Sequence, residues 1–206
     1  HDFLLSHNIP GIENIDTREL TKKVREFGTL LCAFGPLEKE AEISSLLENM
    51  LPPDREDLVS SVTCDEAILM NPGATDEKGQ KLPRLAAIDC GVKYNILREL
   101  CNRFEVVWCP AFSDFETIMN DWSPDALFAS NGPGDPAHRG NALIARNTLA
   151  SAVRAGLPVM GICLGHQLMG LAAGLRTYKL RYGHRGTNQP VLDIETRKVI
   201  ITSQNH

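Results

Sequence analysis

A single cysteine between two glycines constrains the fold of this chain more than any other feature. Cys163 lies two residues after Gly161 and two before Gly165, where a short apolar run at residues 157–162 gives way to a segment with helical spacing. Glycines leave a tight strand-to-helix turn unobstructed, although they reduce packing and increase the entropy lost on folding. We therefore expect a nucleophile elbow, in which the sulfur projects from the turn into a cleft.

The start of a helix is a favourable place for a reactive thiol. A helix N-terminus stabilises negative charge, so it favours the thiolate over the thiol. We expect the backbone amide of Leu164 to stabilise the oxyanion that forms when a thiolate attacks a carbonyl group. A cysteine that only packs in the core is the common alternative. Flanking glycines are poorly explained by packing, so we favour the nucleophile.

From residue 84 onwards, short apolar runs alternate with segments of helical spacing. They predict strands at 85–90, 105–109, 126–130 and 157–162, and helices at 93–103, 113–122, 138–155 and 164–173. This alternation is typical of an α/β fold with a doubly wound, mostly parallel sheet. Ligands of such sheets bind outside the carboxyl ends of the strands. Later runs at 177–182, 191–194 and 199–203 predict antiparallel strands at one side of the sheet.

A second loop at the carboxyl edge of the predicted sheet carries Gly132 and Gly134, within residues 131–136. It has neither the Gly-Lys-Ser/Thr ending of a P-loop nor the spacing of a dinucleotide fingerprint, so we expect no nucleotide there. The two glycines instead suit the exposure of backbone N–H and C=O groups to a small polar ligand. A plain reversal of the chain is the alternative for this loop taken alone.

Composition excludes several classes of function. The net charge is −5 and no basic run is longer than two residues, as in Lys22-Lys23, which argues against a nucleic-acid partner. No apolar stretch approaches the roughly 18 residues of a membrane span, and the start does not resemble a secretory signal, so we expect no membrane partner and a cytoplasmic protein. Six cysteines without a regular spacing predict reduced thiols and no metal site.

The first 70 residues are expected to be part of a smaller α+β domain. Asp16 and Glu19 form a helix-capping pattern, and the helix that follows ends at Gly28. A strand at residues 29–34 and a helix at residues 38–50 are predicted next. Between residues 71 and 83 the composition turns to Gly, Pro and charged residues, which indicates a linker.

Two motifs in order, residues 130–136 and 161–167, resemble the triad-type, class I glutamine amidotransferases. Four further segments resemble the small, glutamine-hydrolysing subunit of carbamoyl-phosphate synthetase: residues 15–21, 88–98, 183–190 and 202–206. By this resemblance, residues 1–70 are part of that subunit's N-terminal domain and residues 84–206 are an amidotransferase domain without its C-terminal part. We therefore expect a chain that is truncated at both ends.

The resemblance implies that Cys163 attacks the side-chain amide of L-glutamine, releases ammonia and forms a glutamyl thioester. It also implies a set of substrate-binding residues: Gly132, Gly134, Leu164, Gln167 and Asn205. The implied partner is the large subunit of carbamoyl-phosphate synthetase, which uses ATP, Mg and bicarbonate to make carbamoyl phosphate for arginine and pyrimidine synthesis. No cofactor is expected on this chain itself.

One part of the family pattern is absent from this sequence. The general base of the family is a His followed two residues later by Glu, in a His-Pro-Glu segment, and none of the six histidines stands in that context. We therefore expect this chain alone to be inactive or weak. The alternatives are another class I amidotransferase, a regulatory subunit that keeps the fold without catalysis, and a thioester hydrolase or cysteine peptidase. Residues 1–70 favour the carbamoyl-phosphate synthetase subunit, and Cys163 with its glycines favours catalysis.

Overall fold

The structure, a computed structural model, describes residues 2–206. It divides into two compact units. The larger unit comprises Leu51–Tyr178 together with Asn205–His206, and the smaller unit comprises the residues up to Met50 together with Lys179–Gln204. All six residues that the sequence predicts for the site fall in the larger unit.

The larger unit is built on a five-stranded sheet in the order β1-β3-β2-β4-β5. Its strands are β1 (Ile68–Leu69), β2 (Arg84–Asp89), β3 (Glu105–Pro110), β4 (Ala126–Ala129) and β5 (Val159–Gly161). All neighbouring pairs are parallel except that of β1 with β3. In the register, Leu85 of β2 lies opposite Val106 of β3 and Ala126 of β4. The mostly parallel sheet predicted from the alternation of elements is confirmed.

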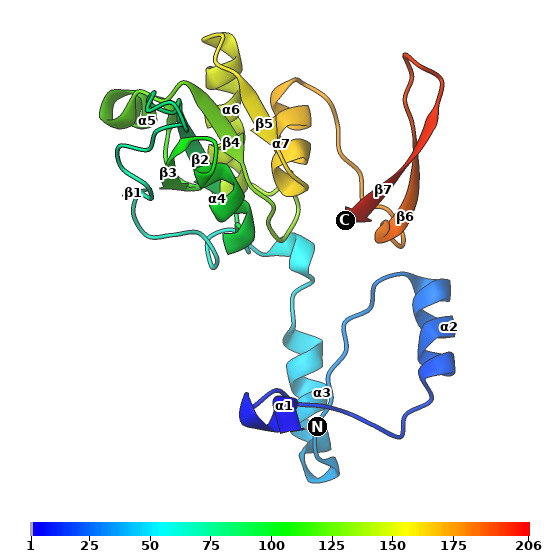
Figure 1. The fold of residues 1–206 in the computed structure, drawn as a ribbon. Coiled ribbons are helices and arrows are strands. Elements are labelled where there is room, and N and C mark those ends of the chain that lie inside the picture. Colours follow the sequence, from blue (N-terminus) through cyan, green and yellow to red (C-terminus); the bar gives the residue numbers. More distant parts are fainter. Residues whose placement is uncertain (1) are drawn as a thin grey trace. The chain divides into compact units, whose positions relative to one another are not determined.

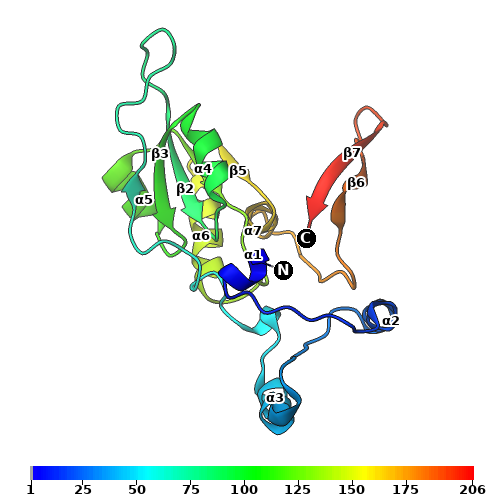
Figure 2. The ribbon, with the colours of Figure 1, turned by 60° about the horizontal axis from the view of Figure 1, so that its bottom comes forward.

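Helices cover both faces of this sheet, as a doubly wound fold requires. The helices are α4 (Tyr94–Cys101), α5 (Phe115–Trp122), α6 (Asn141–Arg154) and α7 (Leu164–Ala172). Apolar residues of α4 pack on one face, and apolar residues of α5, α6 and α7 pack on the other. Figure 1 shows α6 and α7 beside β4 and β5, and Figure 2 shows β2 and β3 side by side with α4 next to them. Within residues 2–206, no helix combines the length and the apolar character that a membrane span requires.

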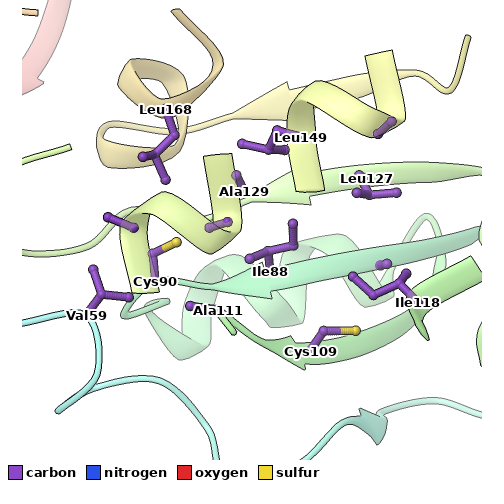
Figure 3. Close-up of a cluster of buried hydrophobic side chains, with 14 of the residues drawn as sticks. Val59, Ile88, Cys90, Cys109, Ala111, Ile118, Leu127, Ala129, Leu149 and Leu168 are labelled. Atoms are coloured by element: carbon purple, nitrogen blue, oxygen red, sulfur yellow. The ribbon is translucent and has the colours of Figure 1, made fainter. Parts of the chain in front are cut away.

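The core beneath α5, α6 and α7 combines large aliphatic side chains with alanines. Ile88 of β2, Leu127 of β4 and Leu149 of α6 are fully buried in this cluster (Figure 3). Three alanines of α6 are buried against the same face: Ala142, Ala145 and Ala152. Small side chains allow the helix backbone to lie close to the sheet, which favours dense packing. Strand β2 is central to this arrangement, because it is buried from Leu85 to Asp89.

The order of the strands creates a switch point at the carboxyl edge of the sheet. From β2 the chain passes outward to β3, then returns to the other side of β2 to form β4 and continues to β5. The loops after β2 and β4 therefore leave in opposite directions, and a crevice outside the strand ends is the usual ligand site of such sheets. The predicted residues Gly132 and Gly134 follow β4, and Cys163 follows β5.

The residues just before the sheet pack with the larger unit. Val59 is 3% exposed and lies in the same apolar cluster as Cys90 and Ala111 (Figure 3). The short strand β1 pairs with β3. In this structure residues 51–70 therefore pack with the sheet, whereas we expected them within the N-terminal domain. The domain boundaries of the whole protein stay a prediction.

The smaller unit contains short helices and a hairpin. Its helices are α1 (Asp2–Ser6), α2 (Thr17–Phe27) and α3 (Glu40–Asn49), the last preceded by a 3₁₀ turn at Leu37–Lys39; a second 3₁₀ turn, Pro53–Arg55, falls in the larger unit. The predicted cap is confirmed, because the Asp16 carboxylate accepts a hydrogen bond of 2.8 Å from the Glu19 amide. The helices have no buried residue, and Phe27 of α2 is 63% exposed.

The strand predictions for residues 29–34 and 177–182 were wrong, because both segments are irregular in the structure. The later runs do form strands, β6 (Arg185–Leu192) and β7 (Val199–Asn205), but these make a two-stranded sheet of their own. We expected them at one side of the large sheet. An apolar run becomes a strand only where a neighbouring strand completes its hydrogen bonds, and local propensity does not supply that neighbour.

A charged cluster fastens the start of β2 to its neighbours. The Arg84 guanidinium donates to the Glu105 carboxylate over 2.7 Å and to the Trp122 carbonyl over 2.6 Å. Glu105 also accepts a hydrogen bond of 2.7 Å from the Gly73 amide, and its side chain is 13% exposed. The Gly73 amide first, and the Arg84 side chain second, lower the pKa of Glu105 below its ordinary value of 4.5. This cluster joins residues 71–83 to the amino end of the sheet.

We predict that Glu105→Gln lowers the free energy of unfolding by about 1 to 2 kcal/mol at pH 7, because charge-assisted hydrogen bonds are lost. A carboxylate whose pKa is lower in the folded than in the unfolded state stabilises the fold at pH values above its ordinary pKa. This stabilisation is lost as the pH falls through the pKa of the folded state. The difference from wild type should therefore shrink as the pH drops below about 4.5. Urea titrations at several pH values measure it. Glu99→Gln on the exposed side of α4 is the control, and an equal loss in that variant would contradict the prediction.

Candidate functional site

The predicted elbow is present, and its cysteine has a strained backbone. Cys163 stands between the end of β5 and the first residue of α7, with φ of 52° and ψ of −110°. A residue with a side chain rarely adopts a positive φ, and such a conformation costs about 1 to 3 kcal/mol. It persists only where the surroundings enforce it. Strain of this kind is common at reactive residues, where it holds a side chain in one direction.

The two flanking glycines are required because the turn is folded tightly on itself. A Cβ at Gly161 would lie 2.5 Å from the Gly165 carbonyl carbon and 2.6 Å from the His166 amide nitrogen. A Cβ at Gly165 would lie 2.5 Å from the Ala129 carbonyl carbon and would clash with the Ala129 carbonyl oxygen. No side chain fits at either position. The sequence-based reason for these glycines, an unobstructed turn, agrees with this geometry.

Backbone hydrogen bonds join the elbow to the end of β4. The Ile162 amide donates to the Ala129 carbonyl over 3.1 Å, and the Gly165 amide donates to the Ser130 carbonyl over 3.0 Å. The N-terminus of α7 is therefore held beside the loop that follows β4. The amides of a first helical turn have no carbonyl partner within their own helix, and Leu164 is the first residue of α7. These amides give the elbow a positive end of a helix dipole.

The loop after β4 lies between the elbow and the turn after β2. The Ser130 hydroxyl accepts a hydrogen bond of 2.9 Å from the Cys90 amide. A Cβ at Gly132 would clash with the Cys90 carbonyl and would lie 2.8 Å from Cδ2 of Leu164. The structure thus brings two predicted site residues, Gly132 and Leu164, into contact. At Gly132 the need for glycine comes from this close approach.

The remaining predicted residues lie near the elbow in different ways. Gly134 has a φ of 87°, so its backbone conformation favours glycine. Gln167 lies one turn into α7, where its amide donates to the Cys163 carbonyl over 3.1 Å, and it is half-buried. The Cys163 thiol is 3.5 Å from the Asn205 carbonyl oxygen, within the larger unit. Contact with Asn205 is thus through its backbone, and the roles of these side chains stay predictions.

Three of the other cysteines, Cys64, Cys90 and Cys109, are poor candidates for a nucleophile. Burial, followed by the charge of Asp89, raises the pKa of Cys64 and of Cys90 to about 12, and burial raises that of Cys109 to about 12. A thiol with so high a pKa is almost wholly protonated at neutral pH and reacts slowly. All six cysteines lie within residues 2–206 and none forms a disulfide. In the described part of the chain, His, Cys, Asp and Glu side chains form no group of three that could hold a metal ion.

Sequence reasoning missed two parts of the site, of which the first is a segment that precedes the sheet. Residues 57–64, called the strap below, are tied to the carboxyl edge by hydrogen bonds with the end of β2, the residue after β3 and the start of α6. Each contact is a single hydrogen bond, and the residues that form these bonds follow no periodic pattern in the sequence. Asp89 was also missed, although a carboxylate directly after a fully apolar run and before Gly91 was a usable signal.

The fold and the site together define a class: an α/β protein with a strained thiol on a strand-to-helix elbow, beside a glycine-rich loop. The family model described as "Glutamine amidotransferase class-I" matches residues 86–206, which is more than half of the chain. The chain belongs to the class I glutamine amidotransferase family.

Among curated proteins, the chain is similar over its whole length to proteins named "Carbamoyl phosphate synthase small chain". The identity is 43% to that of Methanococcus maripaludis strain C5, 41% to that of Methanocaldococcus jannaschii and 41% to that of Methanosarcina mazei. Each match covers 100% of this chain and 55%, 56% and 55% of the relative, respectively. The chain thus spans about half the length of these relatives.

We predict that Gly165→Ala destabilises the larger unit by about 1 to 3 kcal/mol and displaces the elbow, because the new methyl group overlaps the Ala129 backbone. Gly170→Ala, in the same helix, is the matched control, since a Cβ there has no atom within 4 Å. In a helix interior alanine is favoured over glycine by up to about 1 kcal/mol, so this control should be neutral or stabilising. Thermal unfolding of both variants measures the difference. Equal effects of the two substitutions would show that the close contact at Gly165 is not formed.

Proposed function

We propose that this chain is the glutamine-hydrolysing part of a carbamoyl-phosphate synthetase small subunit. The observation that carries the proposal is the elbow, where Cys163, with a positive φ, directly precedes α7, and Leu164, the first residue of α7, lies next to Gly132. The similarity to carbamoyl phosphate synthase small chains supports the choice within the family. It extends over the whole chain, including the residues before 86, which the family model does not cover.

The proposed reaction is hydrolysis of the glutamine side chain in two steps. The Cys163 sulfur forms a bond to the amide carbon, and the C–N bond then breaks, so that ammonia leaves after gaining a proton. Water attacks the resulting glutamyl thioester, breaks the C–S bond and gives glutamate and the free thiol. Covalent catalysis of this kind replaces one difficult amide hydrolysis by two easier steps. The sum is glutamine and water converted to glutamate and ammonia.

Backbone amides supply the proposed charge stabilisation. When the thiolate attacks, the amide oxygen becomes an oxyanion, and the Leu164 amide at the start of α7 is suited to stabilise it. The contact between Gly132 and Leu164 supports a shared role for the loop and the helix start. Gly134, Gln167 and Asn205 are proposed to bind the rest of glutamine. Loss of one hydrogen-bond donor from an oxyanion hole, the role proposed for the Leu164 amide, lowers kcat by about 10²- to 10³-fold.

The proposal requires a general base that this sequence does not contain in the family's His-Pro-Glu form. We propose that the whole protein provides it outside these residues. General acid–base catalysis contributes about 10²- to 10⁴-fold, so this chain alone should hydrolyse glutamine slowly or not at all. The whole cytoplasmic protein would deliver ammonia to a large subunit that uses ATP, Mg and bicarbonate to make carbamoyl phosphate for arginine and pyrimidine synthesis.

We predict that Cys163→Ser, made in the full-length protein with its large subunit, lowers glutamine-dependent carbamoyl phosphate formation by more than about 10³-fold, because the nucleophile is lost. Synthesis from added ammonia should remain, since it does not need the thiol. Cys101→Ser is the matched control: Cys101 is half-buried on α4, away from the elbow. Glutamine-dependent synthesis that survives Cys163→Ser would contradict the proposed nucleophile.

A further inference from the structure

The larger unit contains a buried carboxylate that the proposed reaction does not use. Asp89 ends β2 and is 1% exposed. Its Oδ1 accepts hydrogen bonds of 2.9 Å from the Gly91 amide and 2.8 Å from the Val92 amide, and its Oδ2 accepts one of 2.8 Å from the Cys64 amide. A buried charge is tolerated only where such bonds replace water. The two oxygens of one carboxylate thus join two separate segments.

Through Oδ1, Asp89 is connected to the glycine-rich loop. The turn that Asp89 holds forms two hydrogen bonds with the side chain of Asn131. The Asn131 Nδ2 donates to the Gly91 carbonyl over 2.8 Å, and the Asn131 Oδ1 accepts from the Lys93 amide over 3.3 Å. Asn131 directly precedes Gly132, which packs on the Cys90 carbonyl. The position of the loop therefore depends on the turn that Asp89 shapes.

Through Oδ2, Asp89 is connected to the strap, residues 57–64. Next to the bond at Cys64, the Thr63 hydroxyl accepts a hydrogen bond of 2.8 Å from the Ala111 amide after β3. Val59 is buried in the core, and the Asp57 carboxylate accepts one of 3.0 Å from the Asn141 amide at the start of α6. The strap is therefore fastened at both ends and in the middle.

The strap also lies against the loop itself. A Cβ at Gly91 would be 3.0 Å from Val62 of the strap and 3.1 Å from Pro133 of the loop. A Cβ at Gly134 would be 3.7 Å from Cβ of Leu58. The loop thus has the turn after β2 on one side and the strap on another, and Asp89 bonds to both of these supports.

We propose that Asp89 is a positioning residue for glutamine binding, which sets the place of the Gly132–Gly134 loop by holding the turn after β2 and the strap together. This inference rests on the proposed function. Asp89 touches no substrate in this scheme. Asp89 acts on the position of the loop, whereas Gly161 and Gly165 act on the elbow. The elbow is bonded to the carbonyls of Ala129 and Ser130 and not to Asp89.

The test is Asp89→Asn in the full-length protein. An asparagine retains one acceptor oxygen and turns an NH₂ group towards a backbone amide, so it keeps the bonds of one support and loses those of the other. We expect the KM for glutamine to rise by roughly 10- to 100-fold, because small misplacements of a binding loop have effects of this size. The rate at which iodoacetamide alkylates Cys163 should stay within about twofold of wild type. Asp114→Asn, which makes the same exchange at the exposed carboxylate that caps α5, should leave both values unchanged.

A second variant tests the same connection if Asp89→Asn does not fold. Asn131→Ala removes the next link, and we expect the KM to rise in the same direction. Where both variants fold, the KM of the double variant should rise by less than the product of the two single rises, since both substitutions act through one loop. A wild-type KM in either folded variant, or an equal rise in Asp114→Asn, would overturn the positioning role while the wild type still hydrolyses glutamine. A full-length wild type that hydrolyses no glutamine would overturn the proposed function and this inference with it.

Discussion

The contact on which the site depends is the close approach of the α7 start to the end of β4. It exists because Gly165 has no Cβ, and the Gly165 amide uses the space to reach the Ser130 carbonyl over 3.0 Å. Gly161 lets the strand end turn back on the same helix. With both sides of the turn fixed in this way, Cys163 is left at a φ of 52°. Packing in the sheet thus imposes the strain, and the strain directs the thiol.

The same edge of the sheet is organised by a buried negative charge. Asp89 bonds the turn after β2 and the strap, while the Ser130 hydroxyl bonds the Cys90 amide between them. The loop with Gly132 and Gly134 is supported by these groups, and the elbow is supported by the end of β4. A substrate at this edge would therefore meet two parts that share Ser130 and are otherwise held by different groups, one part for the attacking thiol and one for the bound amide.

Much of this arrangement was predictable from the sequence because its signals are local. The alternation of apolar runs and helical spacing after residue 84 predicted β2 to β5 and α4 to α7, and the glycines around Cys163 predicted the elbow. The strap was not predictable, since its bonds join residues 25, 48 and 84 positions apart without any periodic pattern. The failed strands at 29–34 and 177–182 have a related cause: strand propensity is local, but the partner strand is not.

The central claim is that Cys163 is the nucleophile for a glutamine-like substrate. The most direct measurement is covalent labelling of the full-length protein with a diazoketone analogue of glutamine, followed by mass spectrometry of its peptides. Protonation of the carbon that bears the diazo group, followed by attack of the thiolate on that carbon, would form a thioether and release nitrogen gas. The account predicts a single label on Cys163 that excess glutamine prevents. A label on another cysteine, or a label on Cys163 that glutamine does not prevent, would contradict it.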